Sequence, residues 1–355
     1  MRKFKKHRDY GFFDQDIRLS KLSKLGDPLE ILLENIDFEL FRRLLESGLT
    51  KNAKGKGGRP PYDYVLMFKI VILQRYYNLS DDQTEYQIND RMSFMRFLDL
   101  SIADDIPDSK TVWNFREQLT DLDLIEPLFN LFLDELNTLG LVVNEGKIVD
   151  ASFIEVPKQR NSREENKEIK EGKIPNSFEE NPNKKSQKDV DGLWTKKNNI
   201  SYYGYKNHIK ADAKSKIIVK YKVTDASVHD SQALDCLLDE NDEYEDLYGD
   251  SAYTGKEQKD IISKNEMTDK TCKKGCRNNP LDENDIAINK EKSRVRSRVE
   301  HIFGFMEGAM NGMNLKAIGI KRITAIVGLT NLTYNMFRKI QIQKITKGTC
   351  ILSIN

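Results

Sequence analysis

The stretch KIVDASFIEVP, residues 147–157, marks the point where the sequence changes from helical to strand periodicity. β-Branched residues surround a single acid, Asp150, and Pro157 ends the run. This composition predicts a β-strand. The segments before about residue 140 have helical periodicity, whereas several segments after it do not. We therefore expect an all-α region followed by a mixed-sheet domain, of the α+β or α/β class.

The N-terminal region, residues 1–140, carries apolar residues at steps of three and four. Residues 29–48 predict one amphipathic helix or two short ones. Helical periodicity resumes after a Gly/Lys-rich connector, with Ser80 or Asp81 as an N-cap. Two further helices follow, and the last of them ends at Gly140.

The second region, residues 141–343, combines strands with helices, and residues 344–355 form a tail. Residues 202–227 predict two paired strands, and residues 244–250 predict another strand. Helices are expected over 230–241, 283–311 and 322–344. Between the first strands, residues 158–200 are rich in Lys, Glu and Asn. This composition predicts an exposed, mobile polar insertion.

Charge is nearly balanced: 57 Lys and Arg face 56 Asp and Glu, for a net charge of +1. The balance alone does not indicate a nucleic-acid ligand. Basic residues nevertheless cluster at 2–8, 51–59, 206–222 and 290–298, whereas acids concentrate at 235–250. Separate patches of this kind can bind a polyanion on one face. Ordinary mixing of surface charge is the alternative.

Cellular context is suggested by what the sequence lacks. No apolar run reaches the roughly 18 residues that span a bilayer, and no apolar segment follows the basic N-terminus as in a signal peptide. The four cysteines include a TCKKGC segment, which has no second ligand pair for zinc. We expect a cytoplasmic protein with free thiols and no membrane partner.

Three acids occupy positions suited to a metal site: Asp150 in the first strand, Asp250 at the end of a later strand, and Glu300 on the helix 283–311. Clustered carboxylates repel one another, and their pKa values rise unless cations compensate. Two Mg²⁺ ions roughly 3.5–4 Å apart would compensate and activate a water or hydroxyl for attack on a phosphodiester. Asp225 is a rival strand-end acid, for which a turn or cap role is favoured.

Five segments together resemble the DDE transposases of the bacterial insertion sequence five family. They are GRPPYDYVLMFKIVILQRYYNLSDDQTEYQINDRMSFMRFL (58–98), IVDASFIEVP (148–157), YYGYKNHIKADAKSKIIVKYKVTDASVHDSQ (202–232), YGDSAY (248–253) and RVRSRVEHIFGFM (294–306). The resemblance implies an RNase H-like catalytic domain that uses Mg²⁺, as two ions, with Mn²⁺ able to substitute. It also implies double-stranded DNA partners, namely terminal inverted repeats and target DNA, and a homodimer or higher oligomer on that DNA.

The same resemblance assigns the site. Asp150 matches the acid of the "VDA" strand, Asp250 the acid of a D-x-x-Y motif that ends at Tyr253, and Glu300 the acid of an R-x-x-x-E helix that includes Arg296. These three acids are the expected catalytic and metal-binding residues. The sequence departs from the family signature at Ser293, where a Tyr is usual, and at Glu307, where a Lys that meets DNA phosphate is usual.

Basic residues near these motifs are expected to contact DNA. They are Arg294, Arg296, Arg298, Lys206, Lys110 and Arg116. The last two lie in residues 109–119, a possible recognition helix of a helix–turn–helix, although Trp113, Phe115 and Leu119 are equally consistent with a bracing core helix. Arg296 lies four residues before Glu300, on the same helix face, and either orients that acid, contacts phosphate, or forms a surface ion pair.

Four aromatic residues, Trp194, Tyr202, Tyr203 and Tyr205, flank the insertion. They either stack on unpaired bases at a DNA end or pack into the core. We expect His208 and His229 to be structural, and His301 to pack or to touch DNA.

The predicted function is that of a transposase that binds terminal repeats, cleaves the element ends and transfers strands. The alternative is a catalytically impaired DNA-binding or regulatory protein derived from such an enzyme. A plain metal-dependent nuclease is a third possibility.

Overall fold

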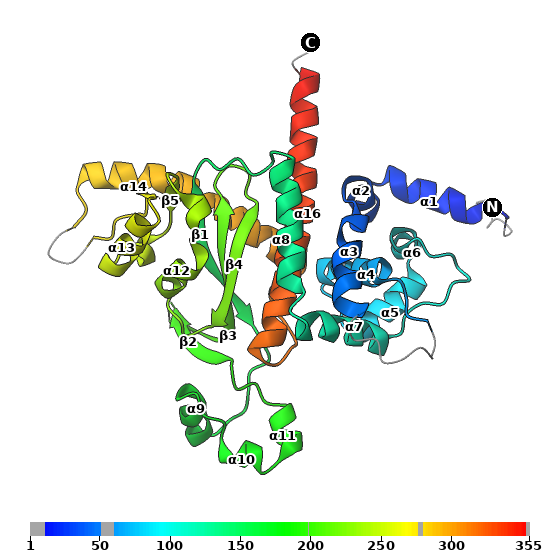
Figure 1. Ribbon diagram of the computed structural model, residues 1–355, viewed down its shortest axis with the longest axis horizontal. Helices are drawn as coiled ribbons and strands as arrows, with labels where there is room; N and C mark the ends of the chain where they lie inside the picture. Colours follow the sequence, from blue (N-terminus) through cyan, green and yellow to red (C-terminus); the bar gives the residue numbers. More distant parts are fainter. Residues whose placement is uncertain (1–10, 51–59, 198, 276–279, 353–355) are drawn as a thin grey trace, which may run out of the picture. The chain divides into compact units, whose positions relative to one another are not determined.

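The computed structural model describes residues 11–50, 60–197, 199–275 and 280–352, coloured along the chain in Figure 1. The chain divides into two compact units, residues 1–74 with 79–115, and residues 75–78 with 116–355. The sequence predicts a boundary at residue 140, where strand content begins. The compact units divide earlier, because the helix over residues 125–138 packs with the second unit.

The described part of the first unit is helical, as predicted. Its elements are α1 (Asp14–Lys24), α2 (Pro28–Asn35), η1 (Phe38–Phe41), α3 (Arg42–Leu49), α4 (Tyr64–Tyr77), α5 (Asp81–Asp90), α6 (Met92–Leu98) and the first half of α7 (Ser109–Asp121). Ser80 caps α5 in a capping box with Gln83, which resolves the choice of N-cap. The Phe41 and Phe68 rings pack in the core, 4.7 Å apart.

All six strands found in the described residues belong to the second unit. Its elements are α8 (Ile125–Thr138), β1 (Lys147–Glu155), α9 (Arg163–Lys170), α10 (Asn176–Glu179), α11 (Pro182–Ser186), β2 (Leu193–Lys197), β3 (Ile200–Asp212), β4 (Ile218–Asp225), η3 (Asp230–Ala233), α12 (Leu234–Leu237), η4 (Glu240–Asp242), β5 (Asp246–Tyr248), η5 (Ser251–Tyr253), α13 (Lys256–Lys264), β6 (Thr268–Asp269), α14 (Glu283–Arg296), η6 (Ser297–Val299), α15 (Glu300–Gly308) and α16 (Ile320–Leu352).

The sheet is mixed, as expected. The strand order is β4–β3–β1–β5–β6, and β2 extends the sheet beside the N-terminal end of β3. β3 runs antiparallel to β1, β2 and β4, whereas β5 and β6 run parallel to β1. This order and these directions are those of an RNase H-like fold. The central strand β1 is the KIVDASFIE segment with which the strand pattern begins.

The register of β1 against β3 is fixed by a close backbone approach. Asp150 pairs with Ile209, and Glu155 pairs with Gly204. Gly204 has φ +137°, and a Cβ added there would lie 2.3 Å from the Ile154 carbonyl oxygen. Only glycine fits this position without a shift of the backbone.

Helices cover the sheet on both sides. α16 packs against α8 and β4, and the approach is close enough that a Cβ on Gly328 would lie 2.3 Å from the Tyr221 hydroxyl oxygen. Buried amides join α16 to the sheet: Asn207 donates to Asn331 at 2.9 Å. A second core, which includes Val149 of β1, Leu234 of α12, Leu247 of β5, Tyr253 and Ile262 of α13, is packed away from solvent.

The polar insertion contains more structure than its composition suggests. It forms the short helices α9, α10 and α11, at the end of β2 and β3 in Figure 1. Ile169 and Phe178 are buried, and the ammonium groups of Lys184 and Lys188 lie over the Phe178 ring. The expectation of an exposed insertion is wrong at these two positions, because two apolar side chains and the lysine stems make a small core of their own.

The predicted helix over 283–311 is divided into α14, the 3₁₀ turn η6 and α15, so Glu300 begins a helix. Within the described ranges, no helix is long and apolar enough to cross a bilayer.

Candidate active site

The first acid, Asp150, lies in the middle of the central strand. Successive side chains of a strand point to opposite faces, so Val149 enters the core while Asp150 points the other way. The Asp150 side chain is 19% exposed. The pKa of this carboxyl is raised to about 6, mainly by burial and to a smaller extent by the Asp250 and Asp230 carboxylates. The hydrogen bond from Ala151 N and the charge of Arg296 act in the opposite direction.

The third acid, Glu300, is linked to Asp150 by one guanidinium group. Arg296 ends α14 with its Nη1 3.5 Å from Asp150 Oδ2 and its Nη2 3.6 Å from Glu300 Oε1. The turn η6 separates Arg296 from Glu300, yet the four-residue spacing still brings the two side chains together. The Glu300 side chain is 68% exposed, so this acid stands at the edge of the site that faces solvent.

The second acid, Asp250, follows β5 and caps the turn η5. Its Oδ1 accepts a hydrogen bond from Ala252 N at 2.8 Å. Because β5 runs parallel to β1 next to it, Asp250 approaches Asp150 closely enough to raise the pKa of that carboxyl. The sequence-predicted triad thus comes from the central strand, its parallel neighbour and a helix that packs beside them.

The Tyr253 hydroxyl is a polar group inside this site. Its oxygen is buried and has no hydrogen-bond partner in the described residues. Burial raises its pKa well above the usual value, and the carboxylates of Asp150, Asp230 and Asp250 raise it further. A buried hydroxyl without a partner is uncommon and calls for an explanation.

A fourth acid, Asp230, also lies within electrostatic range of Asp150. No sequence pattern singles it out, because it begins the short helix η3 rather than ending a strand. Its Oδ1 accepts from Lys206 Nζ at 2.8 Å. Asp225, the rival strand-end acid, accepts hydrogen bonds from the backbone and hydroxyl of Ser227 and has the turn role that was favoured.

Lys206 does not face solvent. Its ammonium group is buried, donates to Asp230 and to Val228 O at 2.7 Å, and lies over the Phe153 ring. The predicted DNA contact of Lys206 is not supported by this arrangement, because its hydrogen bonds are made inside the unit. Lys206 is buried because β3 is covered on both faces, so a side chain that points to either face is removed from solvent.

The remaining predicted DNA contacts lie at the surface or near it. Arg294 is exposed near the end of α14, and Arg298 Nη1 donates to Ala213 O at 2.8 Å. On α7, Lys110 and Trp113 are exposed and Arg116 is partly exposed, whereas Phe115 and Leu119 are buried. The helix therefore has both a core face and a solvent face, and its recognition role stays a prediction.

The aromatic residues divide in the same manner. Tyr203 and Tyr205 are buried, and the Tyr205 hydroxyl donates to Asp189 at 2.7 Å. Tyr202 stacks on Phe153 with centroids 4.1 Å apart, and Trp194 is 44% exposed. Tyr203 and Tyr205 therefore pack into the core, which is one of the two predicted alternatives.

The histidines have different surroundings. His208 is fully buried, its Nε2 shares a hydrogen bond with Thr224 Oγ1 at 2.9 Å, and burial lowers its pKa to about 4. His229 caps η3. Both are structural, as predicted, and His301 is exposed on α15.

The acids fit a divalent cation by their chemistry. Carboxylate oxygens are the hard donors that Mg²⁺ and Mn²⁺ prefer. Burial, the largest cause of the raised pKa of Asp150, disfavours the charged carboxylate, which a bound cation would stabilise. Among the residues described here, no three acidic, histidine or cysteine side chains stand close enough together to hold a metal ion. In this arrangement the positive charge beside Asp150 and Glu300 is supplied by Arg296.

An RNase H-like sheet with acids on the central strand, the adjacent parallel strand and a following helix defines the DDE class of nucleic-acid enzymes. A family model described as "Transposase DDE domain" matches residues 143–336, more than half of the chain, and a model described as "Transposase domain (DUF772)" matches residues 17–118. The chain belongs to the DDE transposases. Its place in the insertion sequence five family stays a prediction.

One solved structure resembles this chain at low identity. It is the cryo-EM structure of the piggyBac transposase synaptic complex with hairpin DNA, at 10% identity and a TM-score of 0.45. The match covers 92% of this chain and 77% of that one.

Proposed function

We propose that this transposase binds terminal inverted repeats, cleaves DNA at the element ends and joins the freed 3′-hydroxyl to target DNA. The observation that carries the proposal is the contact of one arginine, Arg296, with Asp150 and Glu300, at a place where Asp250 also raises the pKa of Asp150. The acids of the predicted triad thus share one electrostatic environment, although they are separated by up to half the chain.

In this proposal Asp150, Asp250 and Glu300 would hold two divalent ions, Mg²⁺ or Mn²⁺, once the three side chains come closer together than in this arrangement. When bound, the ions supply charge that activates a water or a 3′-hydroxyl and stabilises the phosphodiester in the transition state. The protein must present ionised carboxylates. Asp150, with a pKa of about 6, is ionised at neutral pH and protonated in acid, whereas the backbone hydrogen bond to Asp250 fixes the direction of that carboxyl.

The other chain groups position these acids. Arg296 holds Asp150 and Glu300 toward a common point and neutralises part of their repulsion. The buried Tyr253 hydroxyl lies within electrostatic range of Asp150, Asp230 and Asp250 and would donate a hydrogen bond to a carboxylate that turns toward it. The enzyme acts as a homodimer or higher oligomer on nucleoid DNA in the cytoplasm, with no membrane partner.

The sharpest test compares the wild type with Asp250→Asn on a labelled duplex that carries the element's end, in Mg²⁺ or Mn²⁺. We expect metal-dependent nicking at the end by the wild type and none by the variant, with similar affinity of both for DNA. Asp260→Asn, an exposed acid on α13, is the matched control and should cleave like the wild type.

A catalytically impaired regulator is the second candidate, and it rests on the two departures from the family signature. Ser293 contacts Cys272, with Oγ to Sγ at 3.5 Å, and Glu307 is exposed on α15. An acid at position 307 repels phosphate. Tight binding without cleavage by the wild type, followed by cleavage in Glu307→Lys, would identify this candidate. Cleavage by a monomer without paired ends would instead indicate a plain nuclease.

A further inference from the structure

A cavity of about 490 Å³ lies behind the catalytic helix, within the second unit. Its walls come from the start of α15, the turn between β3 and β4, and α16. The lining residues are Lys216, Glu300, His301, Gly304, Phe305, Tyr334, Arg338 and Gln341. The volume is within the roughly 300–1,000 Å³ that is typical of ligand pockets.

The basic groups of this cavity have neutral partners. Arg338 donates through Nε to Ser215 O and through Nη1 to Gln341 Oε1 at 2.9 Å. Lys216 is held by its backbone, because the Tyr334 hydroxyl donates to Lys216 O at 2.8 Å. In the described part of the chain, no carboxylate lies within ion-pair distance of the Lys216 or Arg338 side chain.

These charges also lie close enough to affect one another. The pKa of Lys216 is lowered by burial and then by the charges of Arg338 and Arg298, and burial lowers the pKa of Arg338. Like charges gathered without a counter-ion are costly. Such a cluster is stabilised when an anion enters it, and phosphate is the anion for which arginine and lysine are best suited.

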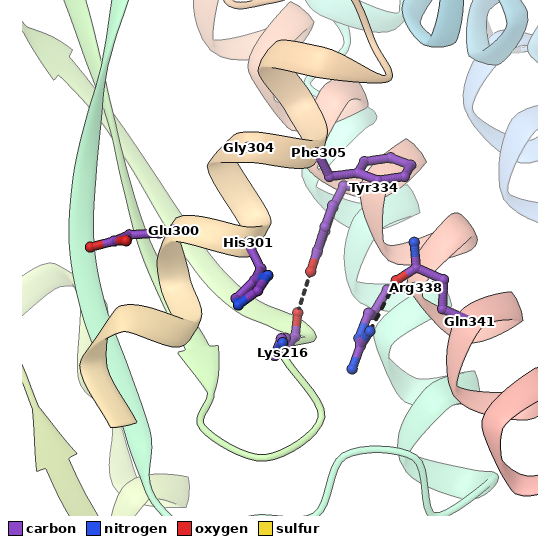
Figure 2. A pocket seen from close by; sticks show the side chains of 8 residues that line it. All are labelled: Lys216, Glu300, His301, Gly304, Phe305, Tyr334, Arg338 and Gln341. Atoms are coloured by element: carbon purple, nitrogen blue, oxygen red, sulfur yellow. Dashed lines mark hydrogen bonds between the residues drawn. The ribbon is translucent and has the colours of Figure 1, made fainter. Parts of the chain in front are cut away.

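The one acid in the lining is turned elsewhere. Figure 2 shows Glu300 directed away from His301, and its carboxylate pairs with Arg296. Glu300 therefore lines the cavity at the start of α15, while its carboxylate faces Arg296, which also contacts Asp150. The cavity is thus next to the place where a phosphate is proposed to react.

We propose that Lys216 and Arg338 bind a backbone phosphate of the DNA strand, close to the phosphate that reacts beside Glu300. The inference rests on the proposed function, because it takes Glu300 as part of the reacting site. It predicts that DNA contacts two basic side chains, Lys216 and Arg338, that lie outside the sequence motifs containing Asp150, Asp250 and Glu300. A phosphate contact carries no sequence information, so this site contributes affinity and position rather than recognition of the terminal repeat.

The test is a salt titration of binding to a duplex of arbitrary sequence. Lys216 has φ +61°, a conformation that asparagine tolerates, so Lys216→Asn is the first variant. The loss of one phosphate contact lowers the slope of log affinity against log salt by about 0.9, which corresponds to about eightfold weaker binding at 0.1 M salt. Arg338→Gln should act in the same direction, and its thermal unfolding shows whether it remains folded.

Lys214→Asn is the matched control. Lys214 lies on the same turn, is exposed, and already pairs with Glu145 at 2.6 Å, so its removal should leave affinity and slope close to those of the wild type. Equal affinity and slope in wild type, Lys214→Asn and Lys216→Asn would overturn the proposal.

Two further measurements separate the other outcomes. If inorganic phosphate, compared with chloride at equal ionic strength, stabilises the wild type but not Lys216→Asn while DNA affinity is the same for both, the cavity is a site for small anions and the proposal fails. If Lys216→Asn weakens DNA binding but the wild type never cleaves an element end in Mg²⁺ or Mn²⁺, the phosphate site stands and the proposed function fails.

Discussion

The Arg296 guanidinium group lies 3.5 Å from Asp150 Oδ2 and is the nearest positive charge to that carboxylate among the ion pairs of the described chain. Asp150 keeps a raised pKa in spite of this neighbour, because burial outweighs the charge of Arg296. Asp150 and Arg296 therefore compensate each other only in part, and the free protein retains a deficit of positive charge at the position where its chemistry is proposed to occur.

Removal of Arg296 should shift the pH dependence of cleavage. In Arg296→Gln the pKa of Asp150 rises above its present value of about 6, since the charge that lowers it is lost. A higher pKa means that a higher pH is needed to ionise the carboxyl, so the acidic limb of the pH–rate profile moves toward higher pH. We also expect a loss of about 10–100-fold in cleavage rate at neutral pH, as for residues that orient metal ligands.

Arg294→Gln provides the comparison for that profile. Arg294 is exposed two residues earlier on α14 and should leave the acidic limb in place, although its loss weakens DNA binding if it contacts phosphate. An unchanged acidic limb in Arg296→Gln would contradict the assignment of Arg296 as the residue that controls Asp150.

Asp150 should also make the metal-free protein less stable as the pH rises. Its pKa goes from 3.8 to about 6 on folding, so the folded state binds the proton more tightly than the unfolded state does. The free energy of unfolding therefore falls between about pH 4 and pH 6, by at most about 3 kcal/mol from this group. The Asp150→Asn variant has no carboxyl to ionise at this position, so its free energy of unfolding should not fall for this reason.

Chemical denaturation of both proteins at pH 3.5 and pH 7 measures the effect. The stability of Asp150→Asn relative to wild type should increase from the lower to the higher pH, whereas Asp260→Asn should show no such trend. Addition of Mn²⁺ should stabilise the wild type at pH 7 and not Asp150→Asn. A constant difference between wild type and Asp150→Asn across this range would show that Asp150 is not held in an unfavourable environment.

The Tyr253 hydroxyl should be dispensable for folding but important for the site. A buried hydroxyl without a partner costs about 1–3 kcal/mol, so Tyr253→Phe should unfold at the same temperature as the wild type or a higher one. If the hydroxyl supports the acids when they hold metal, the same change should weaken Mn²⁺ binding about 10–100-fold, as measured by calorimetry.

Tyr205→Phe is the opposite case and serves as the contrast. The Tyr205 hydroxyl donates to the buried Asp189 carboxylate at 2.7 Å, and the loss of a hydrogen bond to a charged group costs about 1.5–3 kcal/mol. This variant should unfold at a lower temperature with Mn²⁺ affinity unchanged. Destabilisation by Tyr253→Phe of equal size would indicate that its hydroxyl has a partner.

The insertion should lose its structure independently of the sheet. Phe178 is fully buried against the stems and charges of Lys184 and Lys188, and removal of a buried Phe side chain costs about 3–5 kcal/mol. In Phe178→Ala we expect rapid proteolysis within residues 163–186 and little change in the unfolding temperature of the sheet. Proteolysis of Phe178→Ala at the same rate as the wild type would show instead that the structure of α9–α11 does not depend on this side chain.

The fold was largely predictable because its signals are local. Helical periodicity before residue 140 and the strands predicted within 147–157, 202–227 and 244–250 follow from the spacing and type of the apolar residues, whereas β2 and β6 were not predicted. The break at η6 was not predictable, since Arg296, Ser297 and Arg298 are compatible with a continuous helix. The small core of the insertion was also not predicted from the sequence, because it consists of two apolar side chains that form no repeating pattern.

The site was predictable only in part. Asp150 and Asp250 could be proposed from their positions within and at the end of predicted strands, but the choice of Glu300 depended on the resemblance to a known family. Lys206 was expected to contact DNA because it lies in the basic cluster 206–222, and the pairing with Asp230 that buries it joins residues 24 apart in sequence. Contacts between distant side chains, including those of Arg296 with Asp150 and of Lys216 with α16, have no signature in a single sequence.

The close approach at Gly204 has a consequence for folding fidelity. Because a one-residue slip of a strand turns every side chain to the other face, a shifted β1 would bury Asp150 in the hydrophobic core and expose Val149. The glycine at position 204, where the Ile154 carbonyl leaves no room for a side chain, allows the backbones to meet in one alignment. A side chain at position 204 would therefore obstruct the alignment that places Asp150 in the site, and molecules refolded in a shifted alignment would lack activity even if they remained soluble.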